Sequence, residues 1–363
     1  MYTFNGILHD CRKWELTGYI GIPNKEIFRS AIAALRSRGG VTRFRKATGE
    51  GDNIGYAGAK ELAKQGATKD VYDEPDSEIH PNFNLTGAQL ATMTQSLAYK
   101  GICELKNPKC RRSTAQMLAI TRHAVKDQMG IFPDDRQVWK STRHHDFSKV
   151  FRTFIWKSIQ NTHKIGEYWE KIDNYGHRAN CQKCGTTESL EHILLQCDIP
   201  GQAMVWRNTK ELWLKKHGTW PELVNIGTII GCGLIEFRNR GKPLRGENRA
   251  YRILISESTH FIWKLRCARI HSEKPEEEWP KETEIHNRWL AMINARLSLD
   301  KASTNQKYGK KAAKQRVVLS TWEKLLKDER DLPKNWLKTT GVLVGIDQME
   351  HQDGIPDNPD DPP

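Results

Sequence analysis

Four metal-binding side chains stand close together in the middle of the chain. Cys181, Cys184, His192 and Cys197 follow the spacing C-x2-C-x7-H-x4-C. Three thiolates and one imidazole are the donors of a tetrahedral structural zinc site, and such a donor set leaves no position open for water activation. The pattern therefore predicts one structural zinc ion. The competing interpretation is a buried Cys/His cluster without metal.

The residues around these ligands indicate how the chain brings them together. Gly185 suits a tight turn after the second cysteine. Residues 188–197 are expected to form one or two helical turns that return the imidazole and the third thiolate to the metal, and Asp198 and Pro200 end them. Such a site would fold a short segment that lacks a core and would hold the helices on either side of it.

The cysteine content bears on the cellular compartment. The chain has eight cysteines in 363 residues, and those outside the zinc motif lie singly. A disulfide scaffold is therefore excluded, and the C-x2-C pair favours metal binding in a reducing compartment. No signal peptide and no transmembrane segment is evident. We expect an intracellular protein, in the nucleus or the cytoplasm, with no membrane partner.

The net charge points to a polyanionic partner. The formal charge is +13, although residues 347–363 contain six acids and neither Lys nor Arg. Without the six acids of that tail the charge would be +19. Each Lys or Arg placed against a phosphate releases condensed counterions, so the expected partners are RNA, DNA or both. The alternative is a basic surface without a partner.

The hydrophobic pattern predicts a mostly α fold with a small α/β part at the N-terminus. Helices are expected at 7–14, 24–38 and 57–67, with a strand at 41–46. Further helices are expected at 89–99, 112–129, 146–161, 204–217, 249–270, 284–297 and 317–326, with an apolar stretch at 226–234 and a loop at 271–283. The expected regions are a small α/β region at 1–70, a linker at 71–85, a helical region at 86–175 and a zinc-binding segment at 176–200. A second helical region at 201–346 and a disordered acidic tail at 347–363 follow.

Large apolar side chains at helical spacing in the region 86–175 are expected to form its core. Base stacking is the alternative role for its aromatic residues. The expected core residues are Trp139, Phe147, Phe151, Phe154, Ile155, Trp156 and Trp169.

Residues 181–197, followed by Trp206, resemble the reverse-transcriptase zinc-binding segment of non-LTR (LINE-type) retrotransposon polyproteins. All four ligand positions match. The flanking runs 138–141, 154–157, 253–257 and 261–266 are similar to those of fungal elements, so the resemblance covers most of residues 84–346. It implies binding of element RNA or target DNA beside the reverse transcriptase portion of the parent element.

Residues 44–67 resemble the last strand, loop and helix of a type 1 RNase H domain, and 14–24 resemble the segment after its third catalytic carboxylate. The chain would then begin just after that carboxylate. Where the family has His and Asp, this chain has Glu50 and Lys60. RNase H chemistry needs several carboxylates around two divalent metals, so the resemblance implies a truncated, catalytically inactive remnant that does not bind Mg²⁺ productively. The alternatives are ribonuclease activity completed by further N-terminal sequence, or a structural or partner-binding relic.

Several other motifs carry two interpretations. Gly49, Gly51 and Gly55 could form a dinucleotide-binding loop, although the preceding strand is polar and no acid follows at the expected distance. His144, His145 and Asp146 could bind metal or transfer protons; the simpler expectation is that Asp146 caps the next helix. The basic clusters 109–112 and 310–316 could contact phosphates or be solvated. Five cations near the zinc motif are expected to face RNA or DNA: Arg178, Lys183, Lys210, Lys215 and Lys216.

Overall fold

The computed structural model describes residues 2–43, 54–71, 79, 81–84, 87–106, 110–272 and 275–345. The chain divides into two units, Met1–Lys109 and Cys110–Pro363. The boundary falls inside the predicted helical region 86–175, which is therefore shared between both units. The predicted acidic tail at 347–363 lies outside the described residues.

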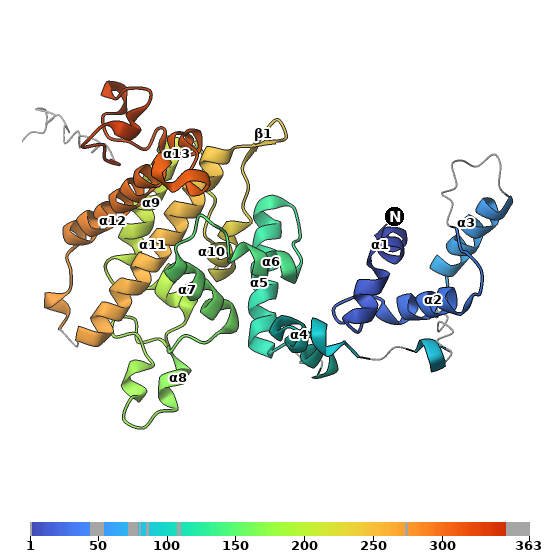
Figure 1. The fold of residues 1–363 in the computed structure, drawn as a ribbon. Coiled ribbons are helices and arrows are strands. Elements are labelled where there is room, and N and C mark those ends of the chain that lie inside the picture. Colours follow the sequence, from blue (N-terminus) through green and yellow to red (C-terminus); the bar gives the residue numbers. More distant parts are fainter. Residues whose placement is uncertain are drawn as a thin grey trace, which may run out of the picture. The chain divides into compact units, whose positions relative to one another are not determined.

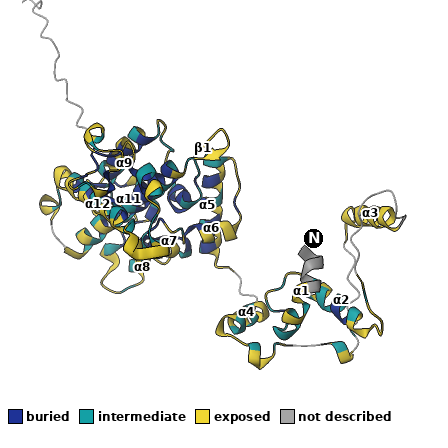
Figure 2. Cartoon of the chain, turned by 45° about the horizontal axis from the view of Figure 1, so that its top comes forward, coloured by how far each residue is buried: buried dark blue, intermediate teal, exposed yellow. Residues whose placement is uncertain are grey.

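The N-terminal unit is helical in its described part and buries few side chains (Figure 2). The predicted helices are present, and the 3-10 turn η2 precedes α4 where one helix was expected. Residues 41–43 form no strand, and the rest of the predicted strand is not described, so the expected α/β character is not seen. The described residues of α3 whose burial is assigned are all exposed. The elements are α1 (Tyr2–Leu16), α2 (Lys25–Ser37), α3 (Ile54–Ala67), η1 (Pro81–Phe83), η2 (Leu90–Thr92) and α4 (Gln95–Lys106).

The C-terminal unit is built around one long helix, α11 (Arg245–Ser272) (Figure 1). Thirteen of its residues are buried, and it packs against α7, α9, α12 and α13. The other helices are α5 (Arg112–Met129), α6 (Asp135–Ser141), α7 (Lys149–Gln160), α8 (Glu167–Glu170), α9 (Gln202–Lys216), α10 (Ile226–Ile230), α12 (Glu282–Ser303) and α13 (Gln315–Trp322).

Short elements connect these helices. A two-stranded antiparallel ribbon, β1 (Arg238–Asn239) and β2 (Lys242–Pro243), precedes α11. The fold is mostly α, as the sequence predicts. The remaining elements are η3 (Gly176–Arg178), η4 (His192–Gln196), η5 (Gly231–Gly233), η6 (Glu276–Glu278), η7 (Gln306–Lys311), η8 (Glu329–Asp331) and η9 (Trp336–Lys338).

Two expectations for the region around α7 were wrong. The helix begins at Lys149, and its cap is the Ser148 hydroxyl, which accepts from the Phe151 N–H at 3.2 Å, so Asp146 is not the cap. Among the predicted core residues, Trp156 is 48% exposed, and Trp169 is only half-buried and lies outside the main core. The phenylalanines and Ile155 are buried as predicted.

The three largest fully buried side chains in the described residues are tryptophans, Trp213, Trp289 and Trp322, and each indole N–H finds an acceptor. Trp213 donates to the Thr219 carbonyl at 2.7 Å, and Trp289 donates to the Ser258 hydroxyl at 2.9 Å. Each buried indole therefore adds apolar area without leaving a polar atom unpaired. No helix in the described part of the chain is both long and apolar enough to cross a bilayer.

Candidate metal centre

A tight turn brings the first two cysteines together. The Gly185 N–H donates to the Cys181 carbonyl at 2.9 Å, and the Cys181 N–H donates to the Thr186 carbonyl at 2.8 Å. Gly185 has a φ of +69°, in the left-handed region that favours glycine. An antiparallel bridge between Asn180 and Thr187 closes the turn at its base.

The other two ligands come from a helical segment of unusual width. Residues His192–Gln196 form a single π-helical turn, and Cys197 follows it in extended conformation. Within this turn the Leu194 carbonyl accepts hydrogen bonds from two side chains: the Trp206 indole N–H at 2.6 Å and the Gln202 amide at 3.1 Å. Residues of α9 therefore hold the turn that carries His192.

The four donor atoms form a compact cluster. One donor atom from each of Cys181, Cys184, His192 and Cys197 lies within 4.8 Å of the others. The Cys181 and Cys197 Sγ atoms are 3.7 Å apart. Two sulfurs on one tetrahedral zinc, each at about 2.3 Å, stand about 3.8 Å apart. The spacing fits zinc and is too long for a disulfide.

The His192 side chain provides an independent sign of a missing ligand. It is buried, and its Nε2 atom has no hydrogen-bond partner among the described residues. A buried nitrogen without a partner costs free energy unless something binds it. A metal ion at the centre of the cluster would satisfy this atom.

The three thiols differ in pKa. Burial opposes ionisation of Cys181, but hydrogen bonds from the backbone of Cys184 and Lys183 bring its pKa down to about 7. Burial raises the pKa of Cys197 to about 12. A divalent cation would supply the positive charge that keeps all three sulfurs as thiolates.

A buried ion pair attaches the zinc-binding segment to the core. Glu188, just after the turn, is buried and accepts from the Arg266 Nε of α11 at 3.1 Å. Its own N–H donates to the Ala179 carbonyl at 2.9 Å. The segment is therefore fixed to the central helix at one side and to α9 at the other.

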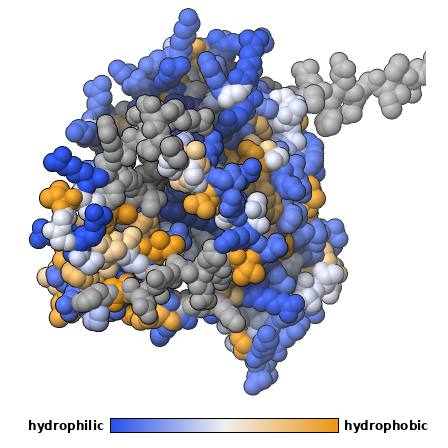
Figure 3. Space-filling model, turned by 90° about the vertical axis from the view of Figure 1, so that its right-hand side faces the viewer, coloured by the Kyte–Doolittle hydropathy of each residue, from blue (hydrophilic) through white to orange (hydrophobic). Residues whose placement is uncertain are grey.

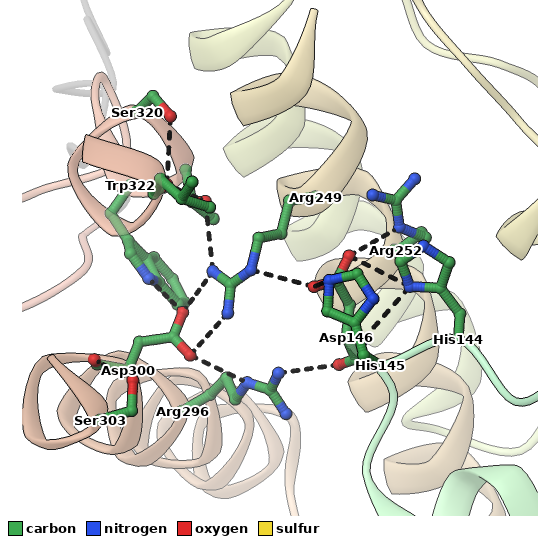
Figure 4. Close-up of polar contacts among 12 residues, drawn as sticks. His144, His145, Asp146, Arg249, Arg252, Arg296, Asp300, Ser303, Ser320 and Trp322 are labelled. Carbon is green, nitrogen blue, oxygen red and sulfur yellow. Dashed lines mark hydrogen bonds and ion pairs between the residues drawn. The ribbon is translucent and has the colours of Figure 1, made fainter. Parts of the chain in front are cut away.

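The second candidate cluster, His144 to Asp146, has a different role (Figure 4). Asp146 is buried, and its two carboxylate oxygens accept from Arg249 Nε at 3.0 Å and Arg252 Nε at 2.8 Å. Burial opposes ionisation, but the two guanidinium groups lower the pKa of Asp146. Two cations already neutralise this carboxylate, so the cluster is a poor cation site.

The arginine network continues from Asp146 to three further helices. Arg249 of α11 also pairs with Asp300 of α12. The Trp322 indole of α13 donates to Asp300 at 2.9 Å, and Arg296 donates to the Asp146 carbonyl at 2.8 Å. Asp146 therefore joins the loop before α7 to α11, α12 and α13. No signal in its own neighbourhood of the sequence could have revealed this.

The five cations predicted to face nucleic acid do not form one free surface. Lys216 is buried, and its Nζ donates to the Ser320 and Glu323 carbonyls at 2.6 and 2.8 Å, so its predicted exposure was wrong. Lys215 donates to the Gly345 carbonyl at 3.0 Å. Lys183 pairs with Glu276, and Lys210 pairs with Glu222.

Arg178 is the fifth of these cations. Its guanidinium lies over the Trp169 and Tyr175 rings, 5.6 and 5.0 Å from their centres. The RNase H resemblance singled out Lys60 and Glu50. Lys60 is exposed on α3, and Glu50 lies outside the described residues, as do Gly49 and Gly51.

Comparison with known proteins identifies no relative. No family model, no curated protein and no solved structure matches the chain.

Proposed function

We propose that Cys181, Cys184, His192 and Cys197 hold one structural zinc ion. The observation that carries this proposal is the convergence of four donors around a buried imidazole nitrogen for which the described residues supply no hydrogen-bond partner. All four donors come from the protein, so the ion would have no open position for catalysis. Its role is to hold the segment 176–200 against α9 and α11.

We further propose that the zinc-stabilised protein binds RNA or DNA. The charge of +13 supports this, because cationic side chains contact phosphates in any sequence context. Hydrophilic residues predominate on the face shown in Figure 3, with apolar ones in small groups among them. Such a surface suits a solvated, charged partner better than an extensive apolar one.

The sequence resemblance supplies a biological setting for this proposal. The chain would be a C-terminal fragment of a LINE-type retrotransposon polyprotein that acts in the nucleus or the cytoplasm beside the element's reverse transcriptase. Residues 1–70 would be an RNase H remnant without catalysis. Lys60 supports this view, since an ammonium group is unsuited to a position that must help to bind Mg²⁺.

Binding of a fluorescent single-stranded RNA at increasing salt concentration tests the proposed function. We expect the logarithm of the association constant to fall linearly with the logarithm of the salt concentration, by about 0.7 for each phosphate contacted. Affinity that is absent, or insensitive to salt, would contradict nucleic-acid binding. Cleavage of an RNA–DNA hybrid above background with Mg²⁺ or Mn²⁺ would contradict the inactive remnant.

A further inference from the structure

A basic groove runs beside α6 and the loop that follows it. Its volume is about 760 Å³. Three of its lining residues are cationic, and two histidines and a half-buried tryptophan lie beside them: Arg136, Lys140, Arg143, His144, His145 and Trp139. No acidic residue lines it.

A second hollow extends the groove towards α7. Its volume is about 270 Å³, and Arg143 borders both hollows. Arg152 and the half-exposed Trp156 also line it. The Arg152 Nε atom is buried and has no hydrogen-bond partner among the described residues. Two cationic hollows that share Arg143 can therefore accept one extended ligand.

The charged side chains that line the two hollows are all cationic. Residues 136–157 contain six Lys and Arg and a single acid, Asp146. That acid is buried and already holds Arg249 and Arg252. Within the described parts of the chain, Arg136, Lys140 and Arg143 pair with no carboxylate. Their positive charge is therefore available to a polyanion.

Two other surfaces of the C-terminal unit match a polyanion less well. The loop around α8 exposes aromatic rings, but its three acids, Glu167, Glu170 and Asp173, equal its Lys and Arg in number within 164–178. The hollow of about 790 Å³ between α5 and the zinc-binding segment is lined by Glu167, Glu188 and Glu191. Carboxylates at these places repel phosphate.

We propose that the groove along α6 and α7 binds a single-stranded stretch of RNA or DNA. Arg136, Lys140, Arg143 and Arg152 contact its phosphates, and Trp156 stacks on a base. A single strand is the fitting partner because a tryptophan ring can reach only bases that are free of a duplex stack. This inference rests on the proposed nucleic-acid binding and locates it away from the zinc site.

The first test compares two charge-matched triple variants of the full zinc-loaded chain. One carries Arg136→Ala, Lys140→Ala and Arg143→Ala; the other carries Lys310→Ala, Lys311→Ala and Lys314→Ala in the exposed basic cluster of η7 and the residues after it. Fluorescence anisotropy with labelled oligo(U) and oligo(dT) measures affinity. We expect the groove variant to bind about tenfold or more weakly, with a salt slope lower by about 2, and the control to change less than about threefold.

The second test separates stacking from charge. Trp156→Ala should weaken binding of oligo(U) by roughly tenfold and leave binding of a blunt duplex of equal length unchanged, and Trp156→Phe should recover most of the loss. Since Trp156 is 48% exposed, the substitution spares the core. Zinc content and circular dichroism confirm that each variant is folded.

The outcomes distinguish the two proposals. If the unaltered chain binds no oligonucleotide, both the groove and the proposed function are wrong. If it binds and the two triple variants lose affinity equally, nucleic-acid binding stands and the groove is overturned. If Trp156→Ala weakens the binding of duplex and of single strand equally, or changes the binding of neither, the assignment to a single strand is overturned.

Discussion

His192 and Asp146 show two ways in which a buried polar group can be satisfied. The Nε2 atom of His192 has no partner among the described residues, whereas both oxygens of Asp146 accept hydrogen bonds from arginines. Leaving a buried polar atom unpaired costs about 1–3 kcal/mol. The unpaired atom therefore indicates a ligand site, and the paired one indicates a structural role.

Replacement of one zinc ligand tests the metal site directly. The unaltered chain should hold one zinc per molecule, and Cys184→Ser should lose it, because a hydroxyl is a much weaker zinc donor than a thiolate. Elemental analysis after dialysis measures the stoichiometry. Cys110→Ser is the matched control, since Cys110 is an exposed cysteine outside the site, and it should retain the zinc. A full equivalent in Cys184→Ser would contradict the assignment.

Removal of the Asp146 charge should destabilise the fold strongly. Asp146→Asn leaves Arg252 without a carboxylate partner among the described residues and leaves Arg249 with Asp300 alone. Breaking a buried pair in this way costs about 3–5 kcal/mol. Urea unfolding measures the free energy of unfolding. Asp135→Asn, which removes an exposed pair with Arg122, should cost less than about 1 kcal/mol. Equal losses in the two variants would count against a structural role for Asp146.

At the scale of elements, the packing of α13 against its neighbours depends on two close contacts. Gly246 of α11 lies against the Ser320 carbonyl, so that a Cβ there would overlap it. From the other side, Lys216 of α9 donates to the Ser320 and Glu323 carbonyls. A lysine at these last carbonyls also complements the negative end of the helix dipole. Burial lowers the pKa of Lys216.

Gly246→Ala should force α11 and α13 apart. Overlap of this kind costs about 1–3 kcal/mol, because a packed backbone carbonyl cannot move aside freely. Gly218→Ala is the control: a Cβ at Gly218 meets nothing within 4 Å, and its effect should stay within about 0.5 kcal/mol. Chemical denaturation of both variants provides the measurement. A neutral Gly246→Ala would show that the two helices tolerate a wider separation.

The end of α7 should make stability depend on pH. The His163 ring packs against Phe154 and Trp263, and burial lowers its pKa from 6.5 to about 4. Between these two values the unfolded chain binds more protons than the folded one. The free energy of unfolding should therefore fall as pH drops from 6.5 towards 4, by up to about 1.4 kcal/mol per pH unit from this residue.

His163→Gln removes the contribution of this imidazole and should make the free energy of unfolding depend less steeply on pH. Urea unfolding at pH 7, 6 and 5 compares the variant with the unaltered chain, so that contributions common to both proteins cancel. Identical slopes in the two proteins would show that His163 does not lose solvation on folding.

At the scale of the whole molecule, the zinc-binding segment is attached to the core of the C-terminal unit at both sides. Glu188 pairs with Arg266 of α11, and the Leu194 carbonyl accepts from Trp206 of α9. A metal ion that orders this segment therefore stabilises the packing around α9 and α11. Binding to the folded state alone shifts the unfolding equilibrium towards that state.

Removal of zinc by a chelator should consequently loosen the C-terminal unit. We expect EDTA to lower the melting temperature of the unaltered chain and to increase hydrogen exchange in α9 and α11. The Cys184→Ser variant should already melt lower and should not respond to EDTA. A chelator response of the same size in this variant would place the metal effect elsewhere.

The sequence by itself determined the features that depend on neighbouring residues. The spacing of the four candidate metal ligands and the periodicity that predicts 112–129 and 249–270 are local, and α5 and α11 confirm the helices. Only the tertiary structure decided which charged side chains are buried. Asp146 meets Arg249 across 103 positions, and Lys216 meets Ser320 across 104. Burial depends on partners that folding brings together from distant parts of the chain, and no local pattern encodes them.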